Sequence, residues 1–137
     1  MNTDSEGIDL TRGKSTSLLL RVETEQIIGC VFHVLNEVGH GFHEKIYENS
    51  LAAAFKLKGI AFDQQRRFPV LFKGEQVGEF IPDFLVFEAV VTDPKVIDQV
   101  TDYERGQMLN YLRITKKRVG LILNFKHARL QWERVVL

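Results

Sequence analysis

Cysteine is almost absent from this sequence. The single cysteine, Cys30, lies among apolar residues and has no second thiol with which to form a disulfide. The histidines show no spacing that builds a zinc site. We therefore expect neither a disulfide framework nor structural zinc, and a reducing cytoplasm is the predicted location.

Net charge and long apolar runs are missing as well. Lysine and arginine number 18 together, as do aspartate and glutamate, so no overall positive field attracts nucleic acid. Any such contact needs a local basic patch. The apolar run at 18–20 is far too short for a signal peptide or a membrane span, so neither export nor membrane insertion is expected.

Hydrophobic residues make up 45% of the 137 positions, which is enough for the single core of one domain. Polar residues without an apolar period fill the start of the chain to about Ser17. Such a segment cannot bury enough surface to offset the entropy of ordering. We predict a flexible arm over residues 1–20 and one folded domain over 21–137.

The first part of the domain predicts a pair of helices. Thr24 can cap a helix whose apolar residues recur at spacings of three and four up to Val38, and Gly39 follows where a helix would stop. A second helix is predicted over about 44–58. Its inward-facing residues are predicted to be Tyr47, Leu51, Ala54 and Leu57. The two helices are expected to form a hairpin.

Shorter, β-like segments dominate the rest of the chain. We predict strands at 60–62, 68–72, 79–87, 90–97 and 119–125, and a last, partly exposed strand at 129–136. Lys73 and Gly74 lie in a predicted turn. Thr101 and Glu104 have the spacing of a capping box, which starts a third helix that runs to about Ile114. This order predicts an α/β domain in which helices flank a mixed, mostly antiparallel sheet.

Asp83, Asp93 and Lys95 are the charged residues that these strands would bring together. Asp93 and Lys95 lie two apart, so they project from one face of their strand. If the preceding strand turns back through a loop centred on Glu88, Asp83 falls opposite Asp93 on the same face. Paired carboxylates repel each other, and a hard cation such as Mg²⁺ or Mn²⁺ relieves that repulsion. With an adjacent lysine, such a site can hydrolyse a phosphodiester.

Each of these residues also has a purely structural interpretation. Asp83 could be satisfied by backbone donors at a strand end, and Asp93 with Lys95 could be a local ion pair. Basic clusters at 66–67, 116–118 and 126–129 can hold phosphates, although such clusters are usually solvated surface. Taken singly, each of these residues favours the structural interpretation.

A set of ordered motifs resembles the GxxExxY proteins, which belong to the PD-(D/E)xK nuclease superfamily. Gly41-x-x-Glu44-x-x-Tyr47 has the spacing of the signature after which those proteins are named. Further similar segments lie at 27–29, 82–86, 107–112 and 120–125, so the resemblance runs from about Thr24 to the C-terminus. Several motifs in the same order are far more specific than one short pattern.

The resemblance implies a restriction-endonuclease-like core and a nuclease activity on DNA or RNA that depends on Mg²⁺ or Mn²⁺. The site residues that it implies are Glu44, Asp83, Asp93, Pro94, Lys95 and Gln107. Among them, the three carboxylates and the backbone carbonyl of Pro94 are the implied metal ligands. Lys95 is the implied catalytic lysine, and Gln107 contributes from the third helix.

Asp93-Pro94-Lys95 departs from the family pattern, which usually has glutamate, an apolar residue and lysine. Aspartate is one methylene shorter, and Pro94 has no N–H for a strand ladder. Two alternatives therefore stay open. One is a catalytically inactive nuclease-fold module that binds nucleic acid or protein, and the other is a structural protein that dimerises through the edge at 129–136. The polymer, its preferred sequence and the pathway are not predicted.

Overall fold

A five-stranded sheet forms the centre of the computed structural model, which describes residues 19–137. The strand order is β1 (Phe62–Gln64), β4 (Phe84–Val86), β5 (Val90–Lys95), β6 (Val119–Asn124) and β7 (Gln131–Val136). β5 and β6 are parallel, and the other neighbouring pairs are antiparallel. The predicted mixed, mostly antiparallel sheet is confirmed. Residues 1–18, which hold most of the predicted arm, lie outside the described part of the chain.

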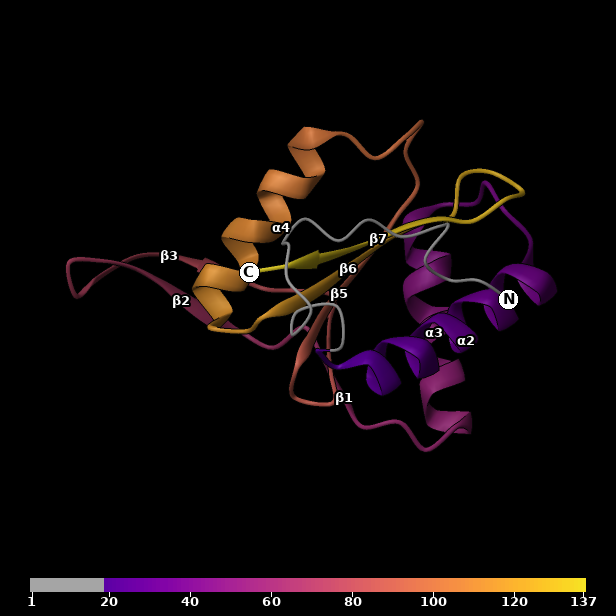
Figure 1. The fold of residues 1–137 in the computed structure, drawn as a ribbon, viewed down its shortest axis with the longest axis horizontal. Coiled ribbons are helices and arrows are strands. Elements are labelled where there is room, and N and C mark those ends of the chain that lie inside the picture. The colour runs from indigo at the N-terminus through magenta and orange to yellow at the C-terminus, as the bar shows by residue number, and fades with distance from the viewer. Residues whose placement is uncertain (1–18) are drawn as a thin grey trace.

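Helices cover both faces of this sheet. Figure 1 shows α4 (Asp102–Thr115) on one side, and α2 (Arg21–Val38) with α3 (Glu44–Leu57) on the other. The α2–α3 side buries Tyr47, Phe55, Phe84 and Phe125, and the α4 side buries Leu85, Val91, Met108, Leu112 and Ile122. Successive strand residues alternate between the two faces, so Asp93 and Lys95 lie on the α4 side, as Val91 does. Among residues 19–137, none of the helices has the length and apolar content of a transmembrane segment.

The predicted helix pair is confirmed, with two corrections. Thr24 is not the cap of the first helix: its N–H bonds to the carbonyl of Leu20 at 2.9 Å, so the first turn is already closed there. The helix begins at Arg21, and the apolar residues Leu19 and Leu20 before it pack partly against the core. Leu57 does not point inward and is 81% exposed. It lies two residues after the buried Phe55, about 200° further around the helix.

The predicted strand at 79–87 is wrong, because the chain divides there into two strands of different sheets. β3 (Glu75–Phe80) pairs with β2 (Phe68–Phe72), and β4 begins only at Phe84. Pro82, which has no N–H for a ladder, lies in the break. The first predicted strand, at 60–62, is also displaced, because β1 covers Phe62–Gln64.

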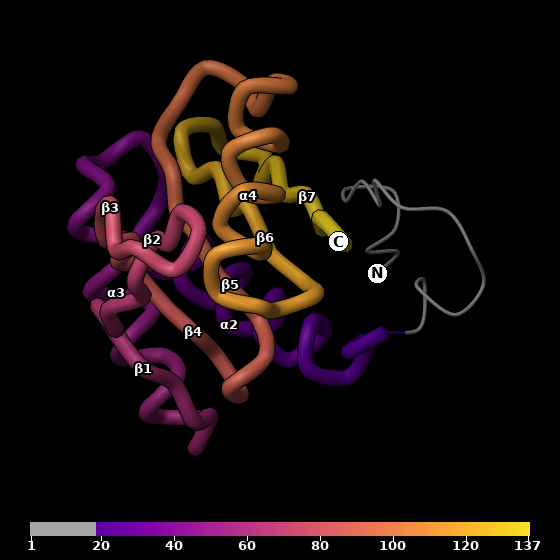
Figure 2. The backbone as a smooth tube through the Cα atoms, turned by 90° about the vertical axis from the view of Figure 1, so that its left-hand side faces the viewer, coloured from indigo at the N-terminus to yellow at the C-terminus, as the bar shows by residue number. Residues whose placement is uncertain are grey.

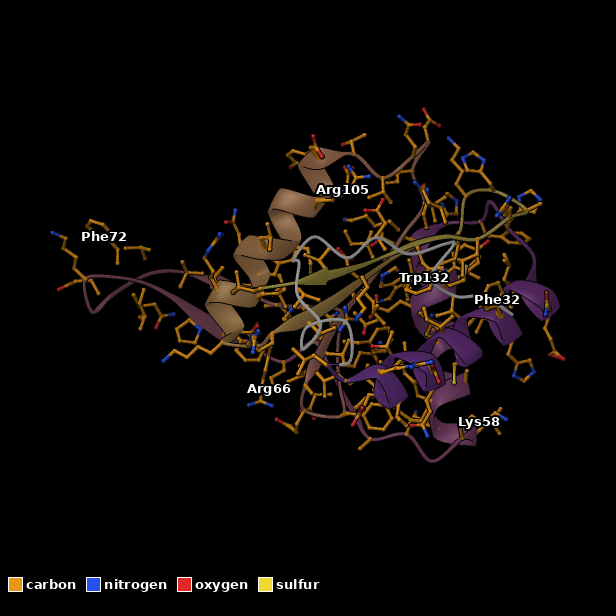
Figure 3. The ribbon with its side chains drawn as sticks, viewed as in Figure 1. Phe32, Lys58, Arg66, Phe72, Arg105 and Trp132 are labelled. Carbon is orange, nitrogen blue, oxygen red and sulfur yellow. The ribbon has the colours of Figure 1, made fainter. Side chains whose placement is uncertain are left out.

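The β2–β3 hairpin extends away from the body of the domain in Figure 1 and points toward the viewer in Figure 2. Its turn is the predicted one: Lys73 and Gly74 both have positive φ values, 49° and 84°. Figure 3 shows Phe72 at the far tip, where its side chain is exposed. At the base of the hairpin, Phe80 stacks on Tyr111 of α4 with ring centroids 3.9 Å apart.

The last strand was predicted to be partly exposed, but β7 is almost entirely buried. Its charged residues are compatible with burial because each has a partner. Glu133 accepts hydrogen bonds from Arg105 of α4 at 2.5 and 2.8 Å, and Arg134 donates to the carbonyl of Leu19 at 2.6 Å. Figure 3 shows Arg105 beside α4, whereas Trp132 of β7 packs into the core on the α2–α3 side. β7 does form an edge of the sheet, and dimerisation through it stays a prediction.

Close packing between α4 and β6 makes Gly120 sensitive to substitution. A Cβ atom there would lie 2.4 Å from Sδ of the buried Met108. We expect Gly120→Ala to lower the free energy of unfolding by about 1–3 kcal/mol through overpacking. In Gly29→Ala, the control on the exposed side of α2, the new Cβ meets no described atom within 4 Å. That variant is expected to gain about 0.5–1 kcal/mol of helix stability. Urea unfolding measures both, and equal stability of the two variants would contradict the packing argument.

Candidate functional site

The β4–β5 hairpin brings Asp83 and Asp93 together. Its register pairs Phe84 with Thr92 and Val86 with Val90, and one further step places Asp83 opposite Asp93, as predicted. The connecting turn contains neither glycine nor asparagine, although Phe87 and Glu88 both have left-handed φ values of 58° and 55°. Asp83 lies one residue before β4, so its position follows from the register of this hairpin extended by one step.

Pro94 is accommodated without a bulge. The parallel register of β5 with β6 continues unshifted from Val90 to Lys95. The carbonyl of Lys95 accepts a hydrogen bond from the N–H of Phe125, on the β6 side. Because adjacent residues direct their backbone groups to opposite edges, Pro94 faces the β4 side, where pairing already ends at Thr92. The missing N–H of Pro94 therefore breaks no described ladder bond, and its carbonyl is directed away from β6.

The Gly41-x-x-Glu44-x-x-Tyr47 segment places Glu44 beside β5. Gly41 has φ +83°, and its N–H bonds to the carbonyl of Phe125 at 2.9 Å. The hydroxyl of Tyr47 donates to the carbonyl of Gly39 at 2.8 Å and accepts from the N–H of Phe42 at 3.1 Å. The Tyr47 ring stacks on Phe125, with centroids 4.3 Å apart. The loop is thus anchored at both ends, and Glu44 is the first residue of α3.

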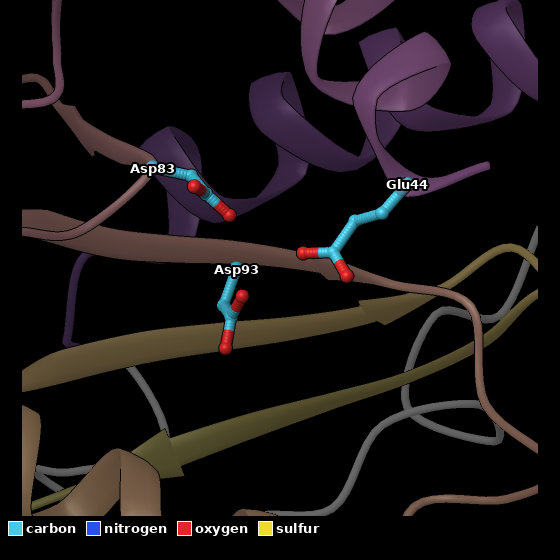
Figure 4. Close-up of side chains that lie close together, drawn as sticks. All are labelled: Glu44, Asp83 and Asp93. Atoms are coloured by element: carbon cyan, nitrogen blue, oxygen red, sulfur yellow. The ribbon is translucent and has the colours of Figure 1, made fainter.

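Three carboxylates and one lysine converge in a cleft of about 240 Å³. Glu44, Asp83 and Asp93 each offer an oxygen within 4.8 Å of the other two, and Figure 4 shows the three carboxyl groups around one shared space. The Nζ of Lys95 lies 3.1 Å from Oδ2 of Asp93 and donates to Oε1 of Gln107 at 3.4 Å. The structure therefore brings together all five side chains predicted for the site.

Burial raises the pKa of each carboxyl group in this cleft, and repulsion between carboxylates adds to the increase at Asp83 and Glu44. For Asp83, burial followed by the charge of Asp93 raises the pKa to about 7. Burial also raises the pKa of Asp93, against the opposing effect of Lys95. The pKa of Glu44 is raised by burial and then by Asp93. Without a further positive charge, the ionised form of the cluster is therefore disfavoured.

Tyr111 also lines the cleft, although the sequence analysis did not place it there. It lies one helical turn after Gln107 on α4, so both side chains face the same way. Burial, and then the charge of Asp93, raises the pKa of its hydroxyl to about 12, so the group stays protonated. The spacing of four from Gln107 was the signal in the sequence that could have identified it.

The basic clusters at 66–67 and 126–129 carry less free positive charge than their sequence suggests. Arg66 pairs with Glu88 at 2.9 Å, Arg67 pairs with Glu79 at 3.0 Å, and Lys126 pairs with Asp98. Each of these cations has a carboxylate partner on the surface. Their net contribution to the local charge is therefore small.

The donor set of the cleft fits a hard divalent cation. All three candidate ligands are carboxylates, and oxygen ligands are the ones that Mg²⁺ and Mn²⁺ prefer. Lys95 is the one basic residue that lines the cleft in the described part of the chain, so negative charge remains uncompensated. A larger hollow of about 490 Å³ beside Cys30 and Lys58 has no acidic residue in its lining. The acidic cleft, and not the larger hollow, is therefore the candidate metal centre.

Comparison with known protein families agrees with this arrangement. Residues 21–135 match the sequence profile described as the PD-(D/E)XK nuclease superfamily. No curated protein and no solved structure matches the chain. The matched region covers nearly all of the described domain, including every residue of the cleft. The chain belongs to the PD-(D/E)XK nuclease superfamily.

Proposed function

We propose that this domain is a nuclease of the GxxExxY type that hydrolyses phosphodiester bonds in DNA or RNA with Mg²⁺ or Mn²⁺. One observation carries the proposal: three carboxylates lie within 4.8 Å of one another, with the Lys95 ammonium 3.1 Å from one of them. Superfamily membership supports nuclease-like chemistry on a nucleic acid. We include in this proposal that the Gly41-x-x-Glu44-x-x-Tyr47 motif marks a GxxExxY protein and that the protein is located in the cytoplasm.

The residues that would hold the cation are Glu44, Asp83 and Asp93, with the Pro94 carbonyl as a further oxygen ligand. Each carboxylate comes from a separate element or loop, namely the start of α3, the residue before β4, and β5. A bound divalent cation would neutralise the cluster and supply Lewis-acid activation of the phosphodiester. The protein's part is to keep these oxygens close together despite their repulsion.

Lys95 would act on the reacting phosphate, and Gln107 would orient Lys95. The Lys95 ammonium is held between Asp93 and Gln107, at 3.1 and 3.4 Å. From this position it can orient the attacking water or stabilise the negative charge that develops on the phosphate. Gln107 accepts from Lys95 and so restricts the direction in which the ammonium points.

Cleavage assays on labelled single-stranded and double-stranded DNA and RNA test this function. We expect the purified chain to cleave at least one of the four substrates with Mg²⁺ or Mn²⁺, and none with EDTA. An inactive nuclease-fold module would cleave no substrate, and its Mn²⁺ binding would be no tighter than millimolar and insensitive to Asp83→Ala. That combination of results would replace the proposal with the binding-module alternative.

A further inference from the structure

A layer of polar side chains behind the acidic cleft connects Asp83 to α3. At its centre is Glu48, which is 5% exposed and lies one helical turn after Glu44. Its Oε2 accepts hydrogen bonds from Nε2 of Gln64 at 2.7 Å and from Nε2 of Gln65 at 3.0 Å. Its Oε1 accepts from Lys45 at 3.2 Å. Both oxygens of this fourth carboxylate are therefore occupied by protein donors.

The charge state of Glu48 suits the role of a fixed acceptor. Burial alone would raise its pKa, but the hydrogen bonds from Gln64, Gln65 and Lys45 lower it below the ordinary value. Glu48 therefore stays ionised. An ionised acceptor forms stronger hydrogen bonds than a neutral one, so it can orient a glutamine amide firmly.

Gln65 connects this acceptor to Asp83. Its Nε2 donates to Oε2 of Glu48 and also to Oδ1 of Asp83 at 3.4 Å. The backbone N–H of Gln65 donates to the carbonyl of Asp83 at 3.3 Å. Asp83 is therefore contacted by Gln65 through both its main chain and its side chain. The neighbouring Gln64 also donates to Glu48, but within residues 19–137 it forms no hydrogen bond to Asp83.

The backbone of Gln65 is also unusual. Its φ is +62°, in the left-handed region that residues other than glycine, asparagine and aspartate rarely adopt. Such a conformation is unfavourable for a glutamine and persists where the surroundings hold it. Here it lies directly after β1, and the side chain reaches both carboxylates from this position.

We propose that Gln65, oriented by Glu48, is a positioning residue that directs the Asp83 carboxylate toward Glu44 and Asp93. The inference rests on the proposed function, because Asp83 needs this direction only if the three carboxylates share a cation. Partners of this kind, one layer behind metal ligands, typically change metal affinity or activity by about 10–100-fold when removed.

The test compares neighbouring glutamines. Gln65→Leu removes the amide, and Gln65→Asn shortens it while keeping a residue that tolerates the left-handed backbone. Gln64→Leu is the matched control, because it removes a bond to Glu48 without touching Asp83. The two measurements are Mn²⁺ affinity by isothermal titration and the side-chain rotamer of Asp83 in metal-free crystals of each variant.

We expect both Gln65 variants to bind Mn²⁺ about 10–100-fold more weakly and to show Asp83 rotated away from Asp93. Gln64→Leu should stay within about twofold of the wild type and keep the Asp83 rotamer. Equal losses in the Gln64 and Gln65 variants, or an unmoved Asp83 in both Gln65 variants, would overturn the inference. If the wild type itself binds no Mn²⁺, the proposed function fails, and the Asp83 rotamer alone then decides the role of Gln65.

Discussion

Replacing Lys95 with alanine is expected to lower kcat for phosphodiester cleavage by about 10²–10³-fold, the usual effect of removing one group that stabilises transition-state charge. Lys95 is the one basic residue lining the cleft in the described region, so no neighbour replaces it. Mn²⁺ affinity should be unchanged or higher, because the substitution removes a positive charge 3.1 Å from a carboxylate ligand. Loss of turnover with retained metal binding is the signature of a catalytic lysine.

Lys58→Ala is the matched control for this experiment. Lys58 is exposed at the opposite end of α3 from Glu44, and Figure 3 shows it far from the hairpin at whose base the cleft lies. Its substitution should leave kcat unchanged. Steady-state cleavage assays at saturating substrate and Mg²⁺ compare kcat for the wild type, Lys95→Ala and Lys58→Ala. Full activity in Lys95→Ala, or equal losses in both variants, would contradict the role given to Lys95.

Asp83→Asn is expected to make the metal-free protein more stable at pH 8 while removing its metal binding. The pKa of Asp83 is raised to about 7 in the folded chain, above about 3.9 in an unfolded one. Its favourable contribution to folding is therefore fully present below about pH 4 and is lost as the pH rises through about 7. Complete burial would make this loss about 4 kcal/mol. Partial exposure to solvent reduces the expected gain of the variant to about 1–2 kcal/mol.

Added Mn²⁺ should reverse the order of stability. At 100 times its Kd a ligand stabilises the folded state by about 2.7 kcal/mol, which the wild type should gain and Asp83→Asn should not. Urea unfolding at pH 8, with EDTA or with Mn²⁺, measures both effects. Glu37→Gln, an exposed substitution on α2, is the control and should stay within about 0.5 kcal/mol of the wild type. A metal-free wild type more stable than Asp83→Asn would contradict the electrostatic argument.

Local periodicity was sufficient to predict the central part of the site. Asp93 and Lys95 share a face because strand residues alternate, and Asp83 lies opposite Asp93 because the residues between them form one hairpin. Glu44 was placed by its motif, and the structure explains the spacing through the contacts of Gly41 and Tyr47 with the loop. Each of these relations depends on residues close together in the sequence or on an uninterrupted register.

Several of the predictions that failed depended on partners distant in the sequence, whereas the errors at Thr24 and Leu57 concern positions within one helix. Burial of Glu133 requires Arg105, which lies 28 positions away on another element. The division of the run at 79–87 has a local sign in the sequence, Pro82, but the apolar residues on both sides of the break outweighed it in the prediction. The role of Gln65 was likewise hidden, since Glu48 and Asp83 meet it only in the folded chain. A single sequence carries no direct record of such long-range pairs.

The most direct test of a shared cation is diffraction from crystals soaked in Mn²⁺, recorded at a wavelength where manganese scatters anomalously. We predict one strong anomalous peak in contact with carboxylate oxygens of Glu44, Asp83 and Asp93. The same crystals soaked in EDTA should show none. Crystals at millimolar Mn²⁺ without a peak between these three residues, or with the strongest peak elsewhere on the chain, would contradict the metal centre on which the proposed chemistry depends.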